Sequence, residues 1–119
     1  MVNIEKLISG RSIDLYAITV QGKCLIRDFI DSLETVDQKK VMALLQRAAE
    51  HGPPSNTEKF KKLEDNIWEF KSFQVRILCA LEVRKIIILT YGFIKKKDKA
   101  PPNEIAKAKE LLKEFHAGR

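Results

Sequence analysis

The sequence predicts an α+β domain in which a small, mainly antiparallel sheet packs against an N-terminal helical hairpin and a C-terminal helix. Residues 12–20 are rich in β-forming side chains, and residues 23–51 carry apolar residues at helical spacing. Residues 67–93 contain three further strand-like runs, and a last helical stretch follows two prolines. Because 119 residues can bury one modest core, we expect a single domain.

Two adjacent stretches predict the helical hairpin. Residues 23–33 place four apolar side chains on one helical face: Ile26, Phe29, Ile30 and Leu33. Thr35 and Gln38 have the spacing of a capping box, so a second helix is expected to begin there. Its apolar side would hold Val41, Leu44, Leu45 and Ala48. Gly52, followed by two prolines, is expected to end it.

The sheet follows as three predicted strands over residues 67–71, 74–82 and 84–93. Alternation places Trp68 and Phe70 towards the core, with Glu69 and Lys71 on the opposite side. By the same alternation, Arg76 is expected to point out onto an open face of the sheet.

The remaining segments complete the expected order β, α, α, β, β, β, α. The consecutive apolar residues 86–89 suit a central strand that is buried on both faces. Asn103 and Glu104 suit the start of a C-terminal helix. Its predicted apolar side consists of Ile105, Ala108, Leu112 and Phe115.

The net charge of +6 is unevenly distributed along the chain. Residues 1–59 contain eight Lys/Arg and eight Asp/Glu, whereas residues 60–119 contain fourteen and eight, so the second half carries the whole excess. This asymmetry is typical of proteins with a polyanionic partner, and a basic surface that serves solubility explains it equally well.

Several classes of protein are disfavoured by what the sequence lacks. No apolar run is long enough to span a membrane, and no secretory signal is evident, so we expect a cytoplasmic protein. Cys24 and Cys79 have no metal-ligand spacing and are expected to be reduced packing residues. No phosphate-binding glycine loop or nucleophile elbow occurs, so neither a metal nor another cofactor is expected.

A set of cations and one phenol remains as the candidate site: Lys71, Arg76, Tyr91, Lys95, Lys96 and Lys97. On an open sheet face they would form a basic concavity that suits RNA, whose phosphates bind cations and whose bases stack on flat groups. Such groups can also cleave RNA without a metal, because the ribose 2′-hydroxyl is an internal nucleophile. Each residue also has an ordinary structural explanation, Arg76 as an ion-pair partner of Glu69 or Glu82 and Tyr91 as a packing residue.

An ordered series of short motifs resembles the RelE/HigB toxin superfamily, in particular its phage-derived branch. The segment KKLEDNIWEFK at residues 61–71 is similar to that family's "K-x-L…LWELR", and Arg76-Ile77 to its "R-I" strand. Residues 88–96, ILTYGFIKK, resemble "LLHGFxKK", and residues 101–108 match "P-x-x-E-I-x-x-A". The resemblance covers about residues 12–118, so we expect one RelE-like toxin domain over residues 12–119 with residues 1–11 as an N-terminal extension.

The resemblance implies the toxin of a type II toxin–antitoxin pair, a metal-independent endoribonuclease that cuts mRNA on the ribosome. Its partner would be a cognate antitoxin, often a helix-turn-helix protein, so DNA would be contacted only through that antitoxin. By this resemblance the catalytic residues are Lys71, Arg76, Tyr91 and Lys95, and Lys96 binds the RNA. The other residues that we expect to bind RNA are Arg84, Lys97 and Lys99. The family usually has arginine where this chain has Lys71, and often histidine at Tyr91.

Two other functions remain open from the sequence. A gyrase-inhibiting toxin of the ParE branch would share the fold, bind a protein and cut no RNA. A non-catalytic phage factor that binds RNA or protein would use the same basic residues without cleavage.

Overall fold

A seven-stranded sheet forms the centre of the described chain. The computed structural model describes residues 1–82, 85–96 and 102–118. Its elements in chain order are β1 (Val2–Ile8), β2 (Asp14–Val20), β3 (Lys23–Cys24), α1 (Leu25–Asp31), α2 (Thr35–His51), β4 (Phe60–Glu64), β5 (Ile67–Ser72), β6 (Val75–Glu82), β7 (Ile86–Ile94) and α3 (Pro102–Ala117). The strand order is β1-β2-β7-β6-β5-β4, and the short β3 pairs with β2.

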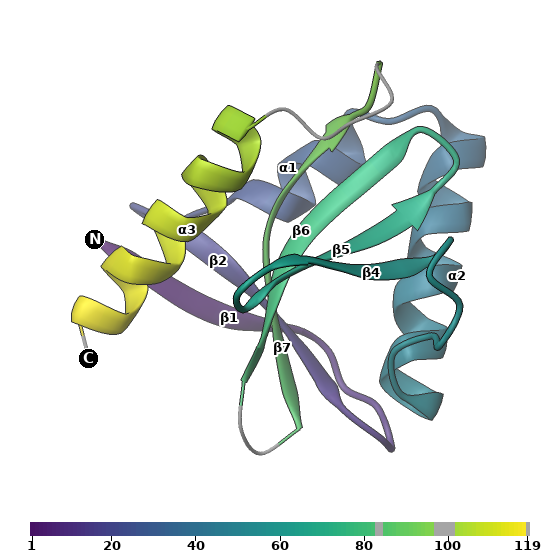
Figure 1. The fold of residues 1–119 in the computed structure, drawn as a ribbon, viewed down its shortest axis with the longest axis horizontal. Coiled ribbons are helices and arrows are strands. Elements are labelled where there is room, and N and C mark those ends of the chain that lie inside the picture. The colour runs from purple at the N-terminus through teal and green to yellow at the C-terminus, as the bar shows by residue number, and fades with distance from the viewer. Residues whose placement is uncertain (83–84, 97–101, 119) are drawn as a thin grey trace.

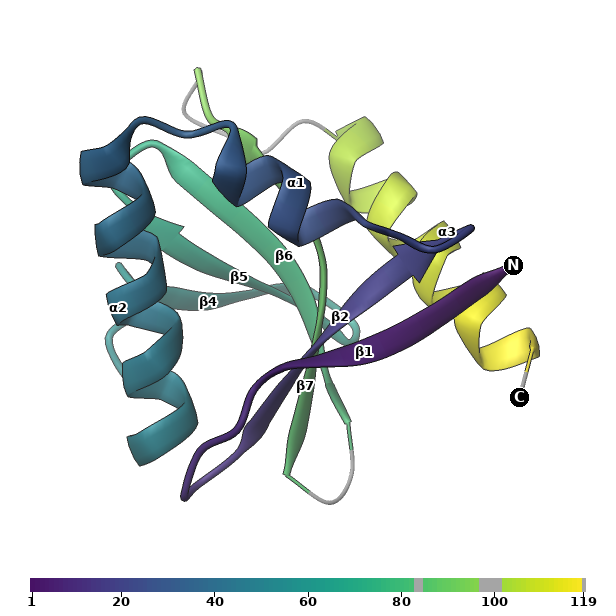
Figure 2. The same ribbon diagram turned by 180° about the vertical axis from the view of Figure 1, so that it is seen from behind.

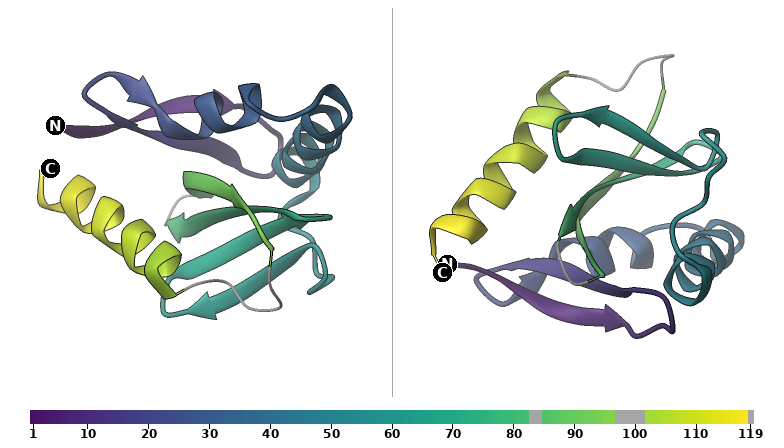
Figure 3. Two further views of the ribbon diagram at one scale, coloured as in Figure 1. Left: turned by 90° about the horizontal axis from the view of Figure 1, so that it is seen from above. Right: turned by 60° about the horizontal axis from the view of Figure 1, so that its bottom comes forward.

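The sheet is antiparallel at every described pairing except one, which confirms a mainly antiparallel α+β fold. The exception is β2 with β7, where Asp14 lies opposite Ile86 and Ala17 opposite Leu89 in parallel register. The strands twist strongly across the sheet, so that β1 and β4 run in very different directions (Figures 1 and 3). Helices α1 and α2 pack on one face, and α3 packs on the other (Figure 2).

The predicted N-terminal helical hairpin is wrong, because the N-terminal region is led by strands. Val2–Ile8 forms β1, which pairs antiparallel with β2 from Val2 opposite Val20 to Ile8 opposite Leu15. This pairing satisfies backbone groups along one side of β2 that would otherwise need water. Helices α1 and α2 follow the strands and meet at a corner instead of lying side by side along their lengths (Figure 2).

The predicted capping box at the start of α2 is also wrong. The N-cap residue is Glu34, and no side chain caps the helix. The Gln38 side chain instead donates to the backbone oxygens of Ile30, at 2.9 Å, and Asp31, at 3.2 Å. These are carbonyls at the end of α1 that have no partner within the helix. Gln38 therefore fastens the end of α1 to the first turn of α2.

Two apolar clusters fill the two faces of the sheet. One contains buried residues of α1, α2 and the sheet, and the other contains Ala108, Leu112 and Phe115 of α3 with residues from the opposite face. The predicted apolar side of the last helix is thereby confirmed. So is the central strand: Ile87 and Leu89 belong to the first cluster and Ile88 to the second. Cys24 and Cys79 are buried and unbridged, as expected of packing residues.

Candidate functional site

The register between β5 and β6 brings two of the predicted site residues together. Lys71 lies directly opposite Arg76, and Glu69 lies opposite Leu78. Residues two apart on a strand share a face, so Glu69, Lys71 and Arg76 lie on the same side of the sheet, facing away from Phe70 and Ile77.

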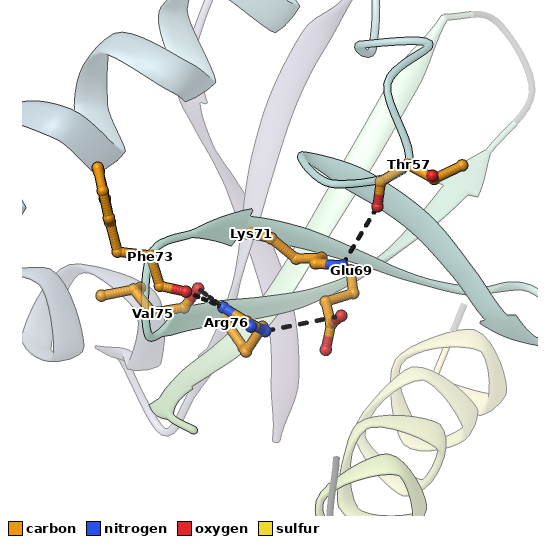
Figure 4. A network of polar contacts seen from close by, with 6 residues as sticks. All are labelled: Thr57, Glu69, Lys71, Phe73, Val75 and Arg76. Carbon is orange, nitrogen blue, oxygen red and sulfur yellow. Dashed lines mark hydrogen bonds and ion pairs between the residues drawn. The ribbon is translucent and has the colours of Figure 1, made fainter. Parts of the chain in front are cut away.

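Arg76 does not project onto an open face, contrary to expectation. Only 8% of Arg76 and 4% of Glu69 are exposed. The Arg76 Nε lies 3.8 Å from Glu69 Oε1, and its Nη1 donates to the backbone oxygens of Phe73, at 2.5 Å, and Val75, at 3.0 Å (Figure 4). The ion-pair explanation from the sequence therefore holds with Glu69, whereas Glu82 contacts His116 instead.

This buried pair is incompletely hydrogen-bonded. Within the described part of the chain, neither Glu69 Oε2 nor Arg76 Nε has a hydrogen-bond partner. Burial raises the pKa of Glu69, and the positive charges of Arg76, Lys71, Lys95 and Lys61 oppose that rise. We call these five residues the Glu69 cluster. It places a desolvated carboxylate among four cations, three of them predicted as catalytic residues.

Tyr91 lies on the same sheet face but is held by α3. It sits opposite Leu78 and is 6% exposed. Its hydroxyl lies 2.7 Å from both the backbone oxygen and Oε1 of Glu104, and can donate its proton to either. Lys107 Nζ lies 4.5 Å from the centre of its ring. Desolvation first, and then the Glu104 carboxylate, raise the pKa of Tyr91, so its phenol stays protonated and serves to fasten α3 to β7.

Replacing Tyr91 by phenylalanine is expected to lower the free energy of unfolding at pH 7 by about 1–2 kcal/mol, because a buried hydrogen bond is lost. The difference should shrink above pH 10. Since its pKa is raised in the folded state, Tyr91 destabilises the wild type as pH rises past 10.0, its ordinary value. Phenylalanine lacks this penalty. Urea unfolding at pH 7 and pH 10.5 measures both effects, and a difference that grows with pH would contradict this account.

The remaining predicted cations divide into described and undescribed positions. Lys95 directly follows β7, and its backbone N–H donates to the oxygen of Gln74 at 2.7 Å. Lys96 is exposed. Arg84, Lys97 and Lys99 lie outside the described residues. Of these predicted site residues, Arg76 therefore contacts Glu69 directly, and the charges of Lys71 and Lys95 act on it.

A hollow of about 680 Å³ lies on the other side of Lys71, between α2, the loop that follows it and the turn between β5 and β6. We call it the α2 hollow. Its lining consists of Lys40, Ala43, Leu44, Arg47, Pro54, Ser55, Asn56, Glu58, Lys59, Lys71, Ser72 and Phe73. Lys71 Nζ donates to the backbone oxygen of Thr57 at 3.2 Å, which turns this side chain towards the loop (Figure 4).

The α2 hollow is positively charged. Its lining carries four cations and one carboxylate, that of Glu58. None of the ion pairs found among residues 1–82, 85–96 and 102–118 involves Lys40, Arg47, Lys59 or Lys71. Four acidic residues of the first half form ion pairs with other cations: Glu5 with Arg27, Asp14 with Lys6, Asp28 with Lys23 and Glu50 with Arg11. The hollow therefore collects cations without their neutralising partners.

Phe73 projects from the turn beside this hollow. It is 72% exposed, and its φ of +56° is a conformation that L-residues rarely adopt. The Lys40 Nζ lies 4.1 Å from the centre of its ring. An exposed aromatic ring in a strained turn contributes little to the packing of the core, so any role of this ring is in contacts at the protein surface.

A comparison with protein families decides the affiliation of the chain. The family model described as phage-derived protein Gp49-like (DUF891) matches residues 28–113. The chain belongs to this family. It is a RelE-like toxin family, so the coarser part of the resemblance seen in the sequence is confirmed. A comparison with curated proteins finds no match for this Gp49-like chain.

The sequence reasoning missed the α2 hollow of this Gp49-like protein. Lys40, Leu44 and Arg47 follow i, i+4, i+7 spacing, so the sequence indicated that the two cations share one face of the helix. Phe73 lies in the two-residue link between the predicted strands 67–71 and 74–82, and a large apolar residue in so short a link is a signal for exposure.

The described residues of the Gp49-like chain contain neither a metal-binding group of side chains nor a membrane-spanning helix. No group of three His, Cys, Asp or Glu side chains in residues 1–82, 85–96 and 102–118 could hold a metal ion. No helix of this part of the chain combines the length and the apolar composition needed to cross a membrane.

Proposed function

We propose that this protein is the toxin of a toxin–antitoxin pair and acts in the cytoplasm as an endoribonuclease on mRNA bound to the ribosome. Its family supports the toxin assignment. The observation that carries the RNA-cutting activity is the buried carboxylate of Glu69, which lies 3.8 Å from Arg76 and on which the charges of Lys71 and Lys95 also act. A helix-turn-helix antitoxin would be the silencing partner.

The Glu69 cluster contains the groups that metal-independent RNA cleavage needs. Glu69 would accept the proton of the ribose 2′-hydroxyl, and its raised pKa makes it a stronger base than an ordinary carboxylate. The 2′-oxygen forms a new bond to phosphorus, and the bond between phosphorus and the 5′-oxygen breaks. Arg76 and Lys71 would hold the phosphate and stabilise its developing charge, and Lys95 would protonate the leaving 5′-oxygen.

Substrate must displace part of the internal pairing for this to occur. Glu69 and Arg76 are buried and contact one another, yet the contact is 3.8 Å long and leaves one polar atom of each without a hydrogen bond. A phosphate offers Arg76 a bidentate partner, which a single carboxylate oxygen at this distance does not. Binding of the phosphate would therefore release Glu69 to act on the 2′-hydroxyl.

Replacing Lys95 by glutamine is expected to slow mRNA cleavage about 100-fold, because a charge that stabilises the transition state is removed. Glu69→Gln should have an effect of at least this size. Both variants and the wild type are incubated with ribosomes and a defined mRNA, and primer extension maps and quantifies the cuts. Lys113→Gln is the matched control, since Lys113 is an exposed lysine of α3 outside the cluster.

Equal cutting by the wild type and both cluster variants would contradict the assigned roles. Growth arrest by the wild type with intact mRNA and a DNA-damage response would replace the nuclease with the gyrase-inhibiting alternative.

A further inference from the structure

The α2 hollow combines charge with an exposed ring. Lys40 and Arg47 lie on the same face of α2, seven residues and therefore about 10 Å apart along the helix axis. They can thus contact different phosphates of one strand. Lys59 and Lys71 bring two more cations from the opposite wall, against the single carboxylate of Glu58. An occupant of this hollow is therefore polyanionic.

Phe73 adds a requirement for a flat group. Its ring is exposed, and its backbone has a positive φ. The Arg76 guanidinium holds the turn in place by donating a hydrogen bond to the Phe73 carbonyl oxygen. Strained residues persist where the surrounding structure holds them, and they concentrate at binding sites. Exposed aromatic rings between cations are the stacking surfaces on which proteins bind unpaired bases.

We propose that the α2 hollow binds a single-stranded RNA segment, with a base stacked on Phe73 and phosphates held by Lys40, Arg47 and Lys59. This inference rests on the proposed endoribonuclease function and assigns to it a substrate-binding site separate from the Glu69 cluster. An acidic protein segment would supply the negative charges but no flat ring to stack, so the observations favour RNA.

Lys71 connects the two sites. Its strand position faces the Glu69 cluster, opposite Arg76, while its ammonium group reaches the loop that lines the hollow. One RNA strand can therefore run from the hollow past Lys71 to the cluster. The nucleotides in the hollow flank the bond that is cut and hold the strand in register.

The test measures binding separately from cleavage. The probe is a fluorescein-labelled, mixed-sequence, single-stranded RNA in which 2′-O-methyl groups replace the nucleophile, and fluorescence anisotropy gives Kd at several salt concentrations. Phe73→Ala and Phe73→Leu are each expected to weaken binding about 10-fold, whereas Phe73→Trp should retain it. Lys40→Ala should weaken binding and lower the salt dependence, by about 0.7 in the slope of log K against log salt for one lost phosphate contact.

Two variants exclude a folding defect. Phe73→Gly should unfold at the same or a higher temperature than the wild type, since glycine adopts positive φ freely, and yet lose affinity as Phe73→Ala does. Lys39→Ala is the control for Lys40→Ala, because it removes a neighbouring exposed lysine that does not line the hollow. It should bind as the wild type does.

Several outcomes would overturn the inference. The first is wild-type affinity for RNA in both Phe73→Gly and Lys40→Ala, and the second is wild-type affinity for RNA in Phe73→Leu. The third is that these variants keep their affinity for RNA but lose affinity for a polyglutamate peptide, which stands for an acidic protein segment. Parallel cleavage assays keep the two proposals apart. If Lys95→Gln loses cutting but RNA binding does not depend on Phe73, only the proposed binding site in the hollow is overturned. If RNA binding depends on Phe73 but the wild type cuts no RNA, the proposed nuclease activity is overturned.

Discussion

Replacing Arg76 by alanine is expected to lower the free energy of unfolding by about 3–5 kcal/mol. The substitution leaves the Glu69 carboxylate buried without its counter-charge and removes the donor to the Phe73 and Val75 carbonyls. Urea unfolding, followed by the fluorescence of Trp68, which is the one tryptophan of the chain, measures the loss.

Acidification and a second substitution test the cause. Below pH 4.5, the ordinary pKa of Glu69, the carboxylate is protonated in both states and the loss should become smaller. The double variant Glu69→Leu/Arg76→Leu should be more stable than Arg76→Ala, because neither charge is left buried alone. A double variant that loses the sum of the two single losses would show that the pair is not coupled.

Replacing Gly10 by alanine is expected to destabilise the protein by about 3 kcal/mol. A Cβ at this position would collide with the carbonyl group and the methyl group of Ala49 near the end of α2. That carbonyl cannot move aside freely, because it accepts hydrogen bonds from the backbone N–H groups of Ser12, at 2.9 Å, and Ile13, at 3.1 Å. Thermal unfolding followed by circular dichroism measures the loss.

Gly118→Ala serves as the control for this substitution. A Cβ at Gly118 would lie 3.5 Å from the nearest backbone oxygen, which is ordinary contact, so its unfolding temperature should match the wild type. If Gly10→Ala also unfolds at the wild-type temperature, the connection between β1 and β2 does not dock on α2 as described.

Elements with strong periodicity were predictable from the sequence. The apolar spacing in α2 and α3 gave both helices, and the run Ile86–Leu89 identified a strand buried on two faces. The strands β1 and β4 were missed, because each occupies an edge of the sheet and few of its side chains are buried. An edge strand is stabilised largely by backbone pairing with a distant segment, which leaves little pattern in its own residues.

The candidate site was predictable in its residues but not in its environment. Alternation correctly placed Lys71 and Arg76 on one face. It could not show that this face is closed around Arg76, since that depends on how Glu69 and the turn at Phe73 enclose the guanidinium. The charge count also misled, because the first half of the chain sums to zero although Lys40, Arg47 and Lys59 of the α2 hollow form no ion pair among the described residues.

The parallel pairing of β2 with β7 has a consequence for biosynthesis. Asp14 emerges from the ribosome early, but its partner Ile86 emerges only when most of the chain has been made. Until then the hairpin of β1 and β2 carries an open strand edge, and β6 and β5 have no link to it. We therefore expect nascent chains shorter than about residue 94 to remain sensitive to protease, because the two halves of the sheet join only when β7 is complete.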